Sequence, residues 1–319
     1  MRALPLMFFL TLIPHQAWAA CIIRGVTPVK ADTPLYDAES GGRTIGQMSG
    51  VKLPLQLSHF GHGRFYVQTT SAKGYVRIEG WASQDAFRFF AGKDLSVVGS
   101  HVWITKGQEV TIADTATDKL LVSRRVAGSK QKVRTKVGCD QIVLEPGASQ
   151  VMDSPPKAHG YQMKGSLLEL YDSPDGKVVF KLLLEGGASK AFWSSERRGN
   201  FVHLLSQADI TIDGWAKVGG LRYLRHDALT DSTYVAPQPW PLRQMKLDNP
   251  PAVLVAEREV RIRSLPAVSG AEIGAIEKGA RFYPMEVSGE WINVLPENLG
   301  VLPPDGGGFW VRREHLPKK

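Results

Sequence analysis

No apolar run in this sequence is long enough to cross a bilayer. The longest, residues 4–13, spans about ten residues, whereas a membrane-spanning helix needs about 20. Pro14 ends this run, and the small-residue site Ala17-Trp18-Ala19 follows. The layout is typical of a secretory signal peptide over residues 1–19. It predicts cleavage after Ala19 and an exported, periplasmic or secreted, mature protein.

Cysteine is also scarce, with only Cys21 and Cys139 present. Export places both in an oxidising compartment, so the even count favours one disulfide. It would close a loop of 118 residues. For such a loop the chain-entropy model predicts a stabilisation of about 4–5 kcal/mol. A competing interpretation stays open, in which Cys21 is the acylated N-terminus of a lipoprotein with a peripheral membrane anchor. Bacterial lipoprotein signals usually place an aliphatic residue where Trp18 stands, so the disulfide is favoured.

Catalytic signatures are missing. The sequence has no Gly-x-Ser-x-Gly elbow, no Walker phosphate loop and no His-Glu-x-x-His zinc motif. His59 and His62 bracket a glycine but have no evident third ligand, so a solvated turn is the better interpretation than a metal site. Cys139 lies in a strand-like segment and has no apparent histidine partner for thiol catalysis. We therefore expect no enzyme, no metal and no cofactor.

Charge is nearly balanced along most of the chain, yet a net charge of +8 remains. The strongest feature lies in residues 119–136, which hold seven cations and no acid. These cations are Lys119, Arg124, Arg125, Lys130, Lys132, Arg134 and Lys136. Two strands joined near residues 127–129 would place several of them on one face. That face is either a solvated hairpin with aggregation-blocking lysines or a contact for an anionic envelope polymer, a lipid headgroup or an acidic protein. Nucleic acid is not expected, because no aromatics interleave with these cations.

Glycine (32) and proline (20) are plentiful, which favours turns over long helices. Three segments repeat a pattern that opens with an aliphatic residue and closes with tryptophan. The spacings from Leu35 to Trp81, Leu170 to Trp215 and Ile262 to Trp310 are 46, 45 and 48 residues. Short strands separated by regular turns predict an all-β protein of sandwiches or small barrels.

The repeated segments resemble the bacterial SH3-like (SH3b) domain family. The last one fits best, with Gly289-Glu290-Trp291-Ile292-Asn293-Val294 and Phe309-Trp310-Val311, whereas the first and third have phenylalanine for the middle tryptophan. The resemblance implies tandem small SH3-like β-barrels joined by Pro-rich linkers. The expected layout is barrel 1 at 20–92, a divergent β-barrel 2 at 93–147, a linker at 148–160, barrel 3 at 161–230, a Pro-rich linker at 231–252 and barrel 4 at 253–319.

Aromatic residues mark the repeats. Trp81, Trp215, Trp291 and Trp310 occupy the repeat positions, and we expect them to fill small cores. Tyr36 and Tyr171 each follow the first aliphatic residue of a strand and should point to its opposite face. They would either line a groove for an extended ligand or be ordinary strand-edge residues.

The function implied by the resemblance is an exported, non-enzymatic binding or scaffold protein of the cell envelope. Its expected partner is cell-wall peptide or glycan (peptidoglycan), or an envelope protein. Lysins combine such domains with a catalytic domain, and no such domain is recognisable here. The alternative is an accessory subunit that regulates or delivers a separate envelope enzyme. A third hypothesis is a hydrolase with an unrecognised site.

Overall fold

The computed structural model describes residues 21–69, 76–116, 119–147, 155–225 and 240–317. The predicted signal peptide lies outside these ranges. Within them the chain is all-β, with antiparallel strands and 3-10 helices of three residues each. This confirms the predicted all-β class. No helix in the described parts of the chain has the length and apolar character needed to span a bilayer.

One order of elements recurs in four stretches of the described chain, which we call units 1 to 4. Each has an opening strand, a second and a third strand, a long hairpin, a closing strand and a 3-10 helix. Unit 1 comprises β1 (Ile23–Pro28), β2 (Thr33–Tyr36), β3 (Thr44–Met48), β4 (Lys52–Gly61), β5 (Arg64–Thr69), β6 (Val76–Ser83) and η1 (Gln84–Ala86). Unit 2 comprises β7 (Phe89–Ala91), β8 (Leu95–Val98), β9 (Val102–Ile104), β10 (Glu109–Ala116), β11 (Lys119–Arg125), β12 (Lys132–Gly138), η2 (Cys139–Gln141) and β13 (Ile142–Val143).

The later two units follow the same order. Unit 3 comprises β14 (His159–Met163), β15 (Leu167–Tyr171), β16 (Val178–Leu183), β17 (Ala191–Arg198), β18 (Phe201–Gln207), β19 (Ile210–Lys217), η3 (Val218–Gly220) and β20 (Leu221–Leu224). Unit 4 comprises β21 (Leu254–Val255), β22 (Val260–Arg263), β23 (Glu272–Ile276), β24 (Arg281–Ser288), β25 (Trp291–Pro296), β26 (Val301–Leu302), β27 (Trp310–Arg312) and η5 (Arg313–His315). The divergent second segment thus has the same element order as the others.

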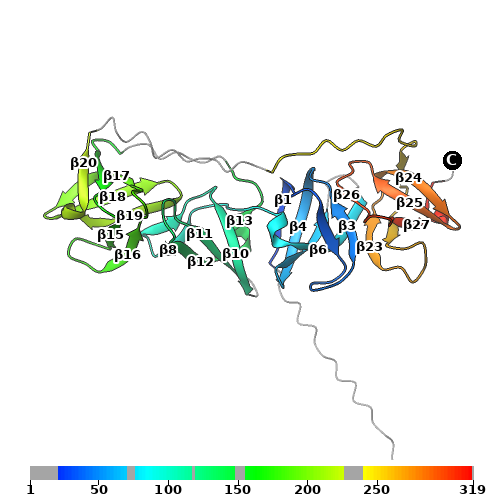
Figure 1. Cartoon of the computed structure of the whole chain (residues 1–319), viewed down its shortest axis with the longest axis horizontal. Helices are drawn as coiled ribbons and strands as arrows, with labels where there is room; N and C mark the ends of the chain where they lie inside the picture. Colours follow the sequence, from blue (N-terminus) through cyan, green and yellow to red (C-terminus); the bar gives the residue numbers. More distant parts are fainter. Residues whose placement is uncertain (1–20, 70–75, 117–118, 148–154, 226–239, 318–319) are drawn as a thin grey trace, which may run out of the picture.

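The units do not follow one another in space as they do in sequence. Figure 1 shows them in a row in the order 3, 2, 1, 4, with unit 4 beside unit 1. The strand pairing agrees, because one 13-stranded sheet joins unit 1 to unit 4 and one 9-stranded sheet joins unit 3 to β8 and β9 of unit 2. The molecule is therefore two joined pairs of units, which meet where unit 1 contacts unit 2.

Unit 4 continues the sheet of unit 1. The third strand of unit 4, β23, pairs with the closing strand of unit 1, β6, with Gly274 opposite Ile78. In return β3 of unit 1 pairs with β26 of unit 4. A Cβ atom at Gly274 would collide with the carbonyl oxygen of Arg77. Glycine is therefore required for this approach of the two backbones.

Units 2 and 3 are joined in the same way, through the third strand β9 and the closing strand β19. Here a buried ion pair adds to the joint. Asp209 Oδ2 accepts a hydrogen bond from Ala127 N at 2.6 Å, and Asp209 Oδ1 lies 2.9 Å from Lys190 Nζ. Burial alone would raise the pKa of Asp209, but the charge of Lys190 and the bond from Ala127 together hold it below its ordinary value.

Among the described residues, units 1 and 2 share no strand ladder. Instead the disulfide between Cys21 and Cys139 bridges them, with the Cα atoms 5.5 Å apart, which confirms the predicted pairing. Thr27 Oγ1 also donates to the carbonyl oxygen of Leu144 at 3.0 Å. A disulfide is typical of proteins outside the cytoplasm.

The described part of the predicted Pro-rich linker, residues 240–252, runs along unit 1 towards unit 4 (Figure 1). The Arg88 guanidinium lies 5.7 Å from the Trp240 ring centroid. Arg243 forms an ion pair with Asp32 at 2.8 Å and donates its backbone N–H to Gly50. This segment is therefore fastened to unit 1 rather than suspended between units.

Candidate binding surface

Three units present a small aromatic cluster on the face opposite the main core. The main core consists of aliphatic and phenylalanine side chains and includes none of the four repeat tryptophans. Leu35 on β2 is fully buried, and its neighbour Tyr36 points to the other face, where it pairs with Trp81 of β6. The same register places Tyr171 opposite Trp215 and Arg263 opposite Trp310. The four tryptophans therefore lie outside the main core, although Trp215, Trp291 and Trp310 are at most 9% exposed.

In unit 1 the cluster is half-exposed and polar at its rim. The Arg64 guanidinium lies 3.7 Å from the centroid of the Tyr36 ring, a distance that suits cation–π attraction. Tyr66 packs edge-on against Trp81 with centroids 5.5 Å apart, and its hydroxyl donates to Glu79 Oε2 at 2.7 Å. Burial, and then the bond to Glu79, raise the pKa of Tyr66 well above its ordinary value. The phenol thus stays protonated and fixes the orientation of the carboxylate.

In unit 3 the equivalent cluster is more closed. Tyr171, Phe201 and Trp215 form a buried group of their own, separate from the main core. His203 stacks on Trp215 with centroids 5.0 Å apart, and its Nε2 lies 2.6 Å from Asp213 Oδ1. His203 and Asp213 occupy the positions that Tyr66 and Glu79 hold in unit 1. Each acid lies two residues before its tryptophan, as Glu79-Gly80-Trp81 and Asp213-Gly214-Trp215.

Cations cover the aromatic rings of unit 3. Lys217 Nζ lies 5.4 Å from the Tyr171 centroid, and the Arg198 guanidinium lies 5.2 Å from the Trp215 centroid. The Tyr171 hydroxyl is 3.1 Å from Glu169 Oε2. The ring of Tyr171 is only 8% exposed, so this tyrosine supports the cluster from beneath. Of the two predicted groove tyrosines, Tyr36 is the one whose ring reaches the surface.

In unit 4 the equivalent positions hold two tryptophans, because Trp310 matches Trp81 of unit 1 and Trp291 matches Arg64. Both are at most 9% exposed. The Arg312 guanidinium lies 5.5 Å from the Trp291 centroid. Arg263, which replaces the tyrosine, donates to the carbonyl oxygens of Val268 and Gly270. Unit 2 places Lys119 at the position of Trp291, because Lys119 pairs with Gly138 as Trp291 pairs with Arg312. Its cluster is therefore not aromatic.

The basic segment of unit 2 does not form a single cationic face. Along β12 the cations Lys132, Arg134 and Lys136 are exposed, while Val133 and Val137 on the other face are buried. Side chains on the same face of a strand recur at about 7 Å. On this strand the three cations form a regular row, which we call the β12 row. The exposed Lys119 starts the neighbouring strand β11.

The other predicted contacts in this segment are engaged within the protein. Arg124 lies on the opposite face of β11, where its guanidinium donates to the carbonyl oxygen of Glu109 at 2.6 Å. Arg125 donates to the carbonyl oxygen of Ser129 at 2.7 Å. Lys130, in the turn, lies 3.4 Å from Glu185 of unit 3. Arg125 and Lys130 nevertheless stay exposed, so Arg124 is the one cation of the seven that is partly buried.

The two histidines that bracket the glycine lie in the β4–β5 hairpin. His59 and His62 both have positive φ, 42° and 47°, and both are exposed. Within the described residues, no three His, Cys, Asp or Glu side chains gather in a way suited to a metal ion.

Comparison with protein-family models, with curated proteins and with solved structures finds no match to this chain. The evidence for a site is therefore its own geometry. Sequence reasoning identified the tryptophans and tyrosines but missed Arg64, Tyr66 and His203. For Tyr66 and His203 the signal was the acid two residues before Trp81 and Trp215, because that acid bonds to the polar ring on the neighbouring strand.

Proposed function

We propose that this protein is an exported, non-enzymatic binding or scaffold protein of the cell envelope, built from tandem SH3-like barrels. The recurrence of one element order in units 1 to 4, with a 3-10 helix after each closing strand, supports the SH3-like assignment. The disulfide between Cys21 and Cys139 supports residence outside the cytoplasm. The ligand that we assign to the outer clusters is peptidoglycan.

One observation carries the proposal, namely the outer aromatic cluster at matched positions in units 1, 3 and 4. A packing role alone would not require the cations that lie over the rings of Tyr36, Tyr171, Trp215 and Trp291. In unit 1 the cluster offers a ring face at Trp81, a carboxylate at Glu79 and a guanidinium at Arg64. Rings with a few fixed polar groups beside them are the usual composition of ligand sites. Sugar rings and short peptides both fit this combination.

Repetition adds to the affinity. When several weak sites on one chain bind one polymer, the later contacts become intramolecular and the effective concentration rises. Peptidoglycan is such a polymer, with repeating glycan and peptide units. Three moderate clusters on one rigid row of units can therefore retain the protein on the wall, although no single cluster forms a deep pocket.

The test is co-sedimentation of the purified mature protein with peptidoglycan. Variant A combines Arg64→Gln with Glu79→Gln, and variant B combines Arg198→Gln with Asp213→Asn. Each removes one polar rim and leaves the net charge of the protein unchanged. We expect each to weaken retention several-fold, and the combination of A and B to weaken it more than tenfold.

Arg24→Gln combined with Glu145→Gln is the matched control, because both side chains are exposed and lie away from the clusters. It should bind as the wild type does. Unchanged retention of the combined variant, with an intact circular dichroism spectrum, would remove the clusters from the proposal. Absence of retention in the wild type would favour the accessory-subunit alternative, in which an envelope protein is the partner.

A further inference from the structure

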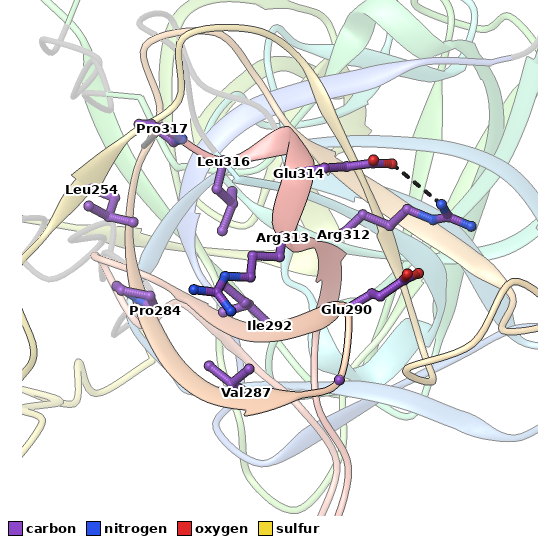
Figure 2. A pocket seen from close by; sticks show the side chains of 11 residues that line it. Leu254, Pro284, Val287, Glu290, Ile292, Arg312, Arg313, Glu314, Leu316 and Pro317 are labelled. Carbon is purple, nitrogen blue, oxygen red and sulfur yellow. Dashed lines mark hydrogen bonds and ion pairs between the residues drawn. The ribbon is translucent and has the colours of Figure 1, made fainter. Parts of the chain in front are cut away.

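Unit 4 carries an open, mostly apolar hollow of about 810 Å³ at its outer end. It lies between the opening strand β21, the β24–β25 hairpin and η5 (Figure 2). We call it the unit 4 bowl. Its apolar lining residues are Leu254, Pro284, Val287, Ile292, Leu316 and Pro317, and its charged ones are Glu290, Arg312, Arg313 and Glu314. Val287 is 58% exposed, whereas its counterpart in unit 1, Phe60, is only partly exposed.

The strand registers show which residues of unit 1 correspond to the residues that line the bowl. Val287 pairs with Ile292 at the end of one hairpin, as Phe60 pairs with Phe65 at the end of the other. Arg313 is the first residue of η5, as Gln84 is of η1. The bowl therefore has a counterpart in unit 1, lined by larger side chains.

In unit 1 this place is filled by the neighbouring unit. Phe89, from the opening strand of unit 2, packs on Phe65 with centroids 5.3 Å apart, and Phe65 packs on Phe60 at 4.8 Å. Gln84 Nε2 donates to the carbonyl oxygen of Ile112 of unit 2 at 2.7 Å. An aromatic side chain thus enters the end of the unit, and the first residue of the 3-10 helix binds an oxygen of the incoming segment.

Unit 4 has the corresponding hairpin residues and 3-10 helix, but among the described residues no neighbouring unit inserts an aromatic side chain between them. Where unit 1 has two phenylalanines, Val287 and Ile292 leave room for one aromatic ring. Figure 2 shows the Arg313 side chain extending into the bowl, while the Glu290 side chain points away from it. The backbone N–H of Arg313 is bonded to Glu290 O at 2.8 Å. Among the described residues, the Arg313 guanidinium has no ion pair, unlike Arg312 beside it, which pairs with Glu314.

We propose that the unit 4 bowl binds a protein partner through an aromatic side chain with a carboxylate next to it. The ring would occupy the apolar floor, and Arg313 would bind the carboxylate, for which a planar guanidinium is suited. This inference rests on the proposed binding role and assigns a partner class to unit 4. A second copy of this chain is a poor occupant, because its own inserted ring, Phe89, is 2% exposed and already packed.

The test uses N-acetyl-L-phenylalanine as the probe and its amide, which lacks the carboxylate, as the control ligand. Both are titrated into the isotopically labelled mature protein and followed by two-dimensional NMR. We expect shifts centred on Ile292, Arg313 and Leu316, and binding of the carboxylate at least about threefold tighter than that of the amide. Arg313→Gln should make the two ligands equal, and Val287→Trp, which fills the bowl, should weaken both.

Arg225→Gln, an exposed arginine of unit 3, is the matched control and should preserve the difference between the ligands. Equal binding of acid and amide to the wild type, shifts centred elsewhere, or no effect of Val287→Trp would overturn the proposal. Analytical ultracentrifugation completes it, since a dimer that Val287→Trp converts to monomer would assign the bowl to a second copy. Arg313→Gln should be retained on peptidoglycan as the wild type is, because the proposed function rests on the outer clusters and not on the bowl, so the two proposals can fail separately.

Discussion

Two kinds of contact join the four units, and they should differ in the substitutions that disrupt them. Units 1 and 4, and units 2 and 3, share hydrogen-bonded strands, so each pair behaves as one extended sheet. Units 1 and 2 instead meet through a disulfide, a few side-chain bonds and the inserted ring of Phe89. A shared strand ladder depends on close backbone approach, whereas the central joint depends on particular side chains. The predictions below test that difference.

The largest effect is expected at the central joint. Replacing both Cys21 and Cys139 by serine should lower the free energy of unfolding by about 4 kcal/mol, since the bond closes a long loop in the unfolded chain. Urea unfolding with and without reductant measures this. Hydrogen exchange should show faster exchange between units 1 and 2 while the β6–β23 and β9–β19 ladders stay protected. Equal loss of protection in those ladders would contradict the distinction between the joints.

The ladder between units 1 and 4 is tested at Gly274. Gly274→Ala should cost about 3 kcal/mol, because the added Cβ meets a backbone carbonyl that cannot move without opening the ladder. Exchange of the amides of Arg77 and Ala275 reports the opening directly. Gly219→Ala is the control, since its Cβ would meet nothing within 4 Å. Equal stability of the two variants would show that the joint is not tightly packed.

The joint between units 2 and 3 should respond to pH through Asp209. Its folded pKa lies below the ordinary value of about 3.9. The ion pair therefore contributes its full stability above pH 4 and loses it as the pH falls through the folded pKa. Asp209→Asn should cost about 2 kcal/mol at neutral pH and remove that acid dependence. An acid transition in urea midpoints that is identical in the two proteins would assign it to other carboxylates.

The smallest effect on stability is expected for the β12 row. Changing Lys132, Arg134 and Lys136 together to glutamine should alter the free energy of unfolding by less than about 0.5 kcal/mol, because exposed charges contribute little. Retention on isolated envelope material should nevertheless weaken and lose its salt dependence, since screening over about 10 Å at 0.1 M acts on such contacts. Retention that is unchanged at low and moderate salt would leave the row as a solvated surface.

Much of the fold follows from local sequence, and most of the joints do not. Strand alternation, turn residues and the matched spacing to each tryptophan depend on neighbours in the chain, so the all-β class could be predicted. The disulfide followed from an even cysteine count. The pairing of β6 with β23 could not be predicted, because registers between distant strands are decided only when the units meet. For the same reason the sequence showed seven cations in one segment, although Arg124 and Lys130 are used within the protein.

The spatial order of the units also bears on how the chain reaches its native state. A protein chain is synthesised from its N-terminus, so unit 1 is available before unit 4, its partner in the shared sheet. The β6–β23 pairing joins residues about 200 positions apart, which gives the native topology a high contact order and slows its formation. Until unit 4 arrives, β6 is an open strand edge of the kind that recruits other chains. The interval between the folding of unit 1 and the arrival of unit 4 is thus the time at which a chaperone, or a mispaired neighbouring chain, can act on β6.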